Sequence, residues 1–130
     1  MKAKDYLMQY RDAMRRTQAI SDHLTELRAV CEQLRTEDGH RVALDAAVAE
    51  LVDTEAKTAA EIERLTALET EIIGVISHMP DPYQTLLYER YINGKTWEQV
   101  AVQMNYSYRH TTKLHGAALA RLKDVLECPT

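Results

Sequence analysis

The sequence predicts an all-α protein, in which a long antiparallel helical hairpin is followed by several shorter helices. The residues that lose least on entering a helix, namely Ala, Leu, Glu, Gln, Lys, Arg and Met, fill 69 of its 130 positions. Glycine and proline, which interrupt helices, occur only four and three times. The sequence lacks the β-branched runs and frequent turn residues that an all-β or α/β protein needs.

The first helix is expected from Asp5 to about Arg35. Apolar residues recur there every three or four positions, which places them on one stripe of a helix. The stripe has a weak point at Thr17, where an apolar residue would be expected. Gly39 suits the left-handed conformation that follows a helix end, so we expect the helix to stop before it.

A second apolar stripe runs from Leu44 to Met79 and is thinnest at residues 55–58. Gly74 lies within it, where either a close helix approach or a bend would explain the glycine. Two long helices joined by a short loop predict an antiparallel hairpin over residues 1–79. Because two helices cover only part of such wide stripes, we expect this hairpin to be an oligomerisation element in a homodimer or higher oligomer. The alternative is a monomer whose C-terminal helices fold back on the hairpin.

Residues 80–130 carry the signals of shorter helices and are expected to form a second domain. Asp81 is a good N-cap, and Pro82 suits the first position of a helix that should run to about Ile92. The Asn-Gly pair at 93–94 then ends this helix, because no alternating strands flank it.

The last two predicted helices have the pattern of a helix-turn-helix. Thr96 and Gln99 have the spacing of a capping box, which opens a short helix ending at Met104. Asn105 occupies a turn position that requires a positive φ, and Ser107 caps the longer last helix. The residues expected on the buried side of this pair are Val100, Ala101, Met104, Leu114, Ala118, Leu119 and Leu122.

The net charge of −4 conceals a difference between the two parts of the chain. Residues 1–78 contain 15 acidic and 10 basic side chains, whereas residues 79–130 contain five and six. No carboxylate occurs between Glu98 and Asp124, a stretch that covers most of the last helix. A basic helix attached to an acidic body is a pattern that nucleic-acid-binding proteins show.

Two segments carry a resemblance to a known family. Residues 86–101 (LLYERYINGKTWEQVA) and 104–109 (MNYSYR), closing on Ala118 and Leu119, resemble sigma-70 region 4. The whole chain resembles small phage transcriptional regulators of the ArpU/RinA kind. The sequence departs from the usual pattern at Asn105, where glycine is common. It departs again at Thr111, where a branched apolar residue normally packs.

The helix-turn-helix pattern and the resemblance predict a sequence-specific DNA-binding transcription regulator of phage type. The helix that starts at Ser107 would enter the major groove of double-stranded DNA. The residues expected to contact base edges are Ser107, Tyr108, Arg109, Thr112 and Lys113. Those expected to contact phosphates are Lys95, Thr96, Arg121 and Lys123. The resemblance also implies host RNA polymerase as a partner.

Two other functions would account for the same sequence. A DNA-recognition subunit of a phage packaging machine also joins a helix-turn-helix to oligomerising helices. A helical interaction protein that does not bind DNA would use the acidic hairpin to hold a protein partner. A ring of many subunits would favour the first alternative, and the absence of binding to any duplex at low salt would favour the second.

Nothing in the sequence predicts an enzyme, a metal site or a cofactor. His110 and His115 are five residues apart and lie on different faces of a helix, unlike the i,i+4 pair of zinc-binding helices. Trp97 is expected to anchor the core of the helix-turn-helix. No stretch is apolar enough to span a membrane, and no signal peptide follows the basic start, so a cytoplasmic location is expected. Cys31 and Cys128 are expected to be free thiols.

Overall fold

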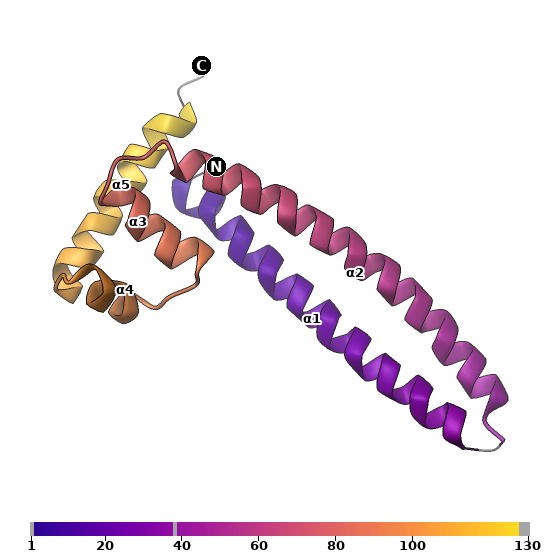
Figure 1. Cartoon of the computed structure of the whole chain (residues 1–130). Coiled ribbons are helices and arrows are strands. Elements are labelled where there is room, and N and C mark those ends of the chain that lie inside the picture. The colour runs from indigo at the N-terminus through magenta and orange to yellow at the C-terminus, as the bar shows by residue number, and fades with distance from the viewer. Residues whose placement is uncertain (1, 38, 128–130) are drawn as a thin grey trace. The chain divides into compact units, whose positions relative to one another are not determined.

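The computed structural model describes residues 2–37 and 39–127, and this part of the chain is helical without any strand (Figure 1). The all-α prediction is confirmed. The elements in chain order are α1 (Ala3–Thr36), α2 (Arg41–Ile76), α3 (Tyr83–Leu87), the π-helix η1 (Tyr88–Ile92), α4 (Trp97–Met104) and α5 (Tyr108–Glu127). None of the described helices is long and apolar enough to cross a membrane. Cys128 lies outside the described residues.

Contacts between residues divide the chain into two compact units. One consists of residues 13–66, and the other joins residues 1–12 to residues 67–130. The second unit therefore combines the ends of α1 and α2 with all the shorter helices, whereas the sequence suggested a boundary between residues 79 and 80. Independent folding of residues 80–130 stays a prediction.

In the unit of residues 13–66, α1 and α2 run side by side in opposite directions (Figure 1). Gly39, in the connection between them, has the predicted left-handed conformation with a φ of 85°. Leu24, Leu27 and Cys31 of α1 are buried, and Cys31 is a free thiol. The expected hairpin is therefore present.

Threonines fill the positions at which the apolar stripes of this hairpin are thin. Thr54 and Thr58 are buried, and the Thr58 hydroxyl donates to the Thr54 carbonyl at 2.7 Å. The Thr17 hydroxyl donates in the same way to the Ala13 carbonyl at 2.8 Å. Because each of these donating hydroxyls bonds to its own helix, the methyl group is left to pack as an apolar residue would.

The other unit buries apolar side chains from both long helices and from the shorter ones. Tyr6 and Tyr10 of α1 direct their hydroxyls to Glu71 and Glu69 of α2, at 3.2 and 3.3 Å. Burial and the neighbouring Glu71 raise the pKa of Tyr6 to about 12, so Tyr6 stays a neutral donor. The core itself consists of side chains from α1, α2 and every shorter helix, among them Leu7, Ile72, Ile76, Leu86, Leu87, Tyr91, Val100, Thr111, Ala118 and Leu122.

The structure corrects the expected start of the third helix. Pro82, not Asp81, is the N-cap, and no side chain caps it. The Asp81 carboxylate accepts instead from the Thr85 hydroxyl at 2.9 Å. The single helix expected up to Ile92 is α3 followed directly by the π-helix η1. At Gly74 a Cβ would have no neighbour within 4 Å, so this glycine does not mark a close helix approach.

Candidate nucleic-acid interface

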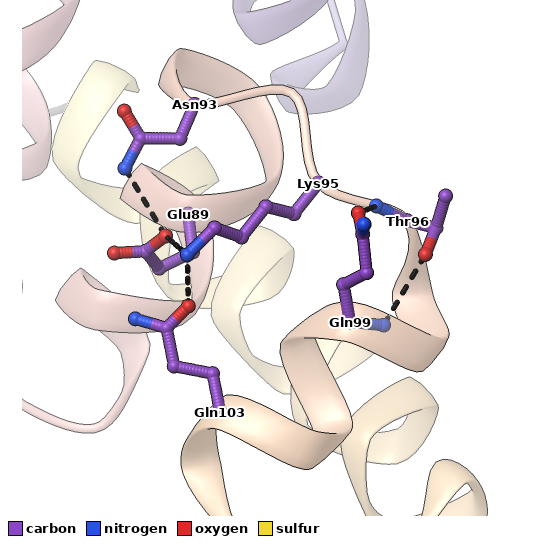
Figure 2. Close-up of polar contacts among 6 residues, drawn as sticks. All are labelled: Glu89, Asn93, Lys95, Thr96, Gln99 and Gln103. Carbon is purple, nitrogen blue, oxygen red and sulfur yellow. Dashed lines mark hydrogen bonds and ion pairs between the residues drawn. The ribbon is translucent and has the colours of Figure 1, made fainter.

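Local hydrogen bonds fix the start of α4 as the sequence predicts. The Thr96 hydroxyl oxygen accepts from the Gln99 backbone N–H at 3.2 Å, and the Gln99 side-chain oxygen accepts from the Thr96 N–H at 2.9 Å. Figure 2 shows this reciprocal pair. The capping box is confirmed, and it satisfies donors at the helix start that would otherwise have no intrahelical partner.

The turn between α4 and α5 also has the predicted conformation. Asn105 is the only non-glycine residue with a positive φ in the described part of the chain, at 59°. The Tyr106 N–H donates to the Ala101 carbonyl at 2.9 Å, which closes the end of α4. Ser107 accepts from the His110 N–H at 3.0 Å and so caps α5. Each of these bonds joins near neighbours, so the turn is defined by its own sequence.

Thr111 packs fully buried despite its hydroxyl group. Its hydroxyl donates to the Ser107 carbonyl at 2.8 Å, which leaves its methyl to face the core. On the buried side of α5 it is followed by Ala118 and Leu122. The departure from a branched apolar residue at this position therefore leaves α5 seated on the core.

All five residues predicted to contact bases are exposed on the first turns of α5 or at its cap: Ser107, Tyr108, Arg109, Thr112 and Lys113. Tyr108 exposes 53% of its surface, which is high for an aromatic side chain. Arg109 and Lys113 are four residues apart and therefore share one face of the helix. In the described part of the chain, neither forms an ion pair. This surface thus offers unpaired cations next to hydroxyl groups.

Of the residues predicted to contact phosphate, Lys95 is held by the protein itself. Its ammonium lies 2.7 Å from the Glu89 carboxylate and also donates to Gln103, as Figure 2 shows. Asn93 donates to the same carboxylate at 3.1 Å. Hydrogen bonds from Lys95 and then Asn93 hold the pKa of Glu89 below its usual value. The charge that Lys95 could present to a phosphate is therefore largely neutralised.

The other predicted phosphate contacts lie in different surroundings. The Arg121 guanidinium lies over the ring of Tyr83, 5.8 Å from its centre, so part of this side chain packs on α3. Lys123 is exposed and has no ion-pair partner among the described residues. Thr96 is exposed, although its oxygen accepts the capping bond.

The sequence reasoning missed an aromatic cluster behind the helix-turn-helix. The His115 ring lies 4.3 Å from the Trp97 ring between centres, and its Nε2 is 2.7 Å from the Tyr91 hydroxyl. On Trp97 lies the Arg90 guanidinium, 4.7 Å from the ring centre. His115 falls four residues after the buried Thr111, and this helical spacing could have placed it on the inner side of α5. Trp97 is half-buried in this cluster, consistent with an anchoring role.

The π-helix η1 directs consecutive side chains to different partners. Glu89 binds Lys95, the Arg90 guanidinium donates to the Lys95 carbonyl at 2.8 Å, and Tyr91 reaches His115. A π-helical turn contains an extra residue, which changes where successive side chains project. The short loop that leads into α4 is consequently held at two groups of Lys95, its ammonium and its carbonyl. This arrangement fixes α4, and with it α5, on the core.

The His115 cluster predicts a loss of stability in mild acid. Burial, with the charges of Lys4 and Arg90, lowers the pKa of His115 to about 4. In the unfolded chain the pKa of this histidine is near 6.5, so the unfolded chain binds more protons than the folded protein between pH 6.5 and 4. The stability contributed by neutral His115 is therefore complete above pH 6.5 and falls toward pH 4. In NMR titration of the folded protein, we expect the His115 ring to titrate with a pKa of about 4.

A His115→Gln variant is the control for this prediction. Between pH 6.5 and 4 its melting temperature should fall less steeply than that of the wild type, because the titrating group is gone. A His115 ring that titrates near 6.5 in the folded protein would contradict the burial of its neutral form.

Comparison of the chain with family models, curated proteins and solved structures finds no match. Among the described residues, no group of three or more His, Cys, Asp and Glu side chains could hold a metal ion.

Proposed function

We propose that the chain is a sequence-specific DNA-binding transcription regulator of phage type, which reads the major groove of double-stranded DNA with the first turns of α5. One observation supports this above all. The exposed residues of these turns combine two unpaired cations with a tyrosine and hydroxyls, on a helix whose start is fixed by Ser107 and by left-handed Asn105. Base edges in the major groove are recognised by side chains of these kinds.

The fixed geometry is what distinguishes this surface from an ordinary solvated helix. Sequence reading requires that side chains reach the groove at defined positions, and a helix on a rigid support meets this requirement. The capping box at Thr96, the turn and the Lys95–Glu89 pair all restrain α4 and α5. By its resemblance to sigma-70 region 4, the same domain would also contact host RNA polymerase.

The experiment that tests the proposal is selection of bound sequences from a random duplex pool, combined with affinity measurements from about 50 to 200 mM salt. We expect one sequence to be enriched, and we expect affinity to fall steeply with salt. The protein has a net negative charge, so attraction depends on the local cations of α5. Unchanged affinity across this salt range would remove DNA as the partner.

We also expect the unit of residues 13–66 to join two copies of the chain. Several large apolar side chains are exposed on it, including Val52 at 59% and Ile62 at 49%. A second copy would cover them, and each buried side chain contributes roughly 1.5–3 kcal/mol. Sedimentation equilibrium should give a dimer for the wild type and a monomer for the Val52→Lys, Ile62→Lys double variant.

Ala60→Lys provides a control for this double variant, because it adds one charge at an exposed small residue of the same helix. It should remain dimeric. A wild type that is monomeric at high micromolar concentration would contradict the expected role of the hairpin. A ring of many subunits would favour the packaging function over regulation.

A further inference from the structure

A lysine-lined cleft lies between the start of α1 and the C-terminal half of α5. Its volume is about 750 Å³, and its lining residues are Lys2, Ala3, Lys4, Asp5, Leu119, Ala120 and Lys123. Three of these seven residues are lysines and one is acidic, so the cleft is electropositive. The remaining lining residues, Ala3, Leu119 and Ala120, have small or aliphatic side chains.

The cleft lysines differ from Lys95 in having no carboxylate partner. No ion pair to Lys2, Lys4 or Lys123 occurs among the described residues, and all three are exposed. A lysine ammonium is a compact charge on a flexible stem, which suits contact with phosphate oxygens without fixed geometry. The positive charge of the cleft is therefore available to an anion.

The cleft continues the face of α5 that carries the proposed base contacts. At 100° per residue, Arg109, Lys113 and Lys123 lie within about 80° of one another around the helix axis. The positions between them on this face are Gly116 and Ala120, both exposed and small. The cationic face thus runs from Arg109 to Lys123, fourteen helical steps or ~21 Å, a length that spans about six phosphates of one DNA strand.

We propose that Lys2, Lys4 and Lys123 form a second contact surface for the sugar-phosphate backbone of the duplex that α5 reads. This inference rests on the proposed function and extends the DNA contact from the helix-turn-helix to the first turn of α1. Because the cations are spread along one helix face and onto a second helix, they match an extended polyanion better than a single small anion. The surface would increase affinity without contributing to sequence preference.

The lysines of the chain provide the test, because only six are present and they lie in different surroundings. The 130-residue chain is acylated at its amines with and without the selected duplex, and each lysine is quantified by mass spectrometry. We expect the duplex to protect Lys2, Lys4 and Lys123 together with Lys113 of the proposed reading face. Lys57, in the other unit, should react equally in both samples. Lys95 should react slowly in both, since Glu89 holds it.

A pair of triple variants separates a local contact from a change in net charge. The first variant removes the cleft cations by the substitutions Lys2→Gln, Lys4→Gln and Lys123→Gln. The second removes three exposed cations of residues 13–66 by the substitutions Arg16→Gln, Arg41→Gln and Lys57→Gln. In the first variant, the negative slope of log affinity against log salt should become shallower by about 2–3, and the base preference should stay that of the wild type. The second should keep the wild-type slope.

The outcomes distinguish this inference from the proposed function. Protection of Lys113 without protection of Lys2, Lys4 and Lys123 would overturn the second surface and leave the reading face intact. Equal effects of the two triple variants on the salt slope would do the same. No binding and no protection at Lys113 would overturn the proposed function, and the inference with it. Unchanged DNA affinity in the cleft variant, with loss of binding to a polyglutamate peptide, would assign the cleft to an acidic protein instead.

Discussion

Arg109→Ala is expected to weaken binding to the selected duplex by roughly 1–3 kcal/mol and to relax preference at one base position. Arg109 is the second residue of α5, and the N-terminal turns of a recognition helix are the part that enters the groove. Its guanidinium is exposed and can bond in bidentate fashion to a guanine. Binding of random duplexes should fall less, because no base is recognised there.

Arg121→Ala is the matched comparison. Arg121 is twelve residues further along α5, or ~18 Å, too far to reach the same base pairs. We expect its loss to weaken selected and random duplexes alike and to make the salt slope shallower. Because the Arg121 side chain also lies over Tyr83, both variants must first be shown to melt as cooperatively as the wild type. Equal losses on the two duplexes for Arg109→Ala would contradict the assignment of the reading face.

Glu89→Gln is expected to lower the free energy of unfolding by about 1–2 kcal/mol, after allowing for partial solvent screening of the pair. The Glu89 side chain is 13% exposed and that of Lys95 is 35% exposed, so the ion pair is mostly shielded from water. Loss of the carboxylate leaves the Lys95 ammonium without its partner and the loop before α4 less restrained. Urea unfolding of the single variants and of the Glu89→Gln, Lys95→Gln double variant measures the coupling.

The same variant has opposite expected effects on stability and on nonspecific binding. Once Glu89 is neutral, Lys95 can contribute its full charge, so random duplexes should be bound more tightly at low salt. The pKa of Glu89 is lowered in the folded state, so its contribution to stability is present above its unfolded pKa and is lost as the pH falls. If Glu89→Gln were as stable as the wild type and bound random duplexes no more tightly, the role given to this pair would be contradicted.

The sequence predicted those features that depend on neighbouring residues. The capping box at Thr96 and the Ser107 cap each join a backbone group and a side chain three positions apart, and both are confirmed. The left-handed conformation of Asn105, a property of that residue's own backbone, is also confirmed. The two long helices also followed from periodicity. Asp81 was the exception, because its carboxylate bonds to Thr85 rather than to the helix start.

Contacts between distant residues could not be predicted in this way. Tyr91 and His115 are 24 positions apart and meet only because η1 and α5 share a core. The pairing of Lys95, predicted as a phosphate contact, with Glu89 has no helical spacing to indicate it, because a π-helical turn and a loop lie between the two residues. The apolar stripe is thinnest at residues 55–58, yet Thr58 is buried, because its hydroxyl bonds to its own helix.

Base reading by Arg109 is tested most directly by methylation interference at guanine N7 on the selected duplex, compared between wild type and Arg109→Ala. If Arg109 reads a guanine in the major groove, methylation of one guanine should block the wild type and have no further effect on the variant. Interference at other guanines should be the same for both proteins. If methylation of every guanine affected the two proteins equally, base reading by the first turns of α5 would be contradicted.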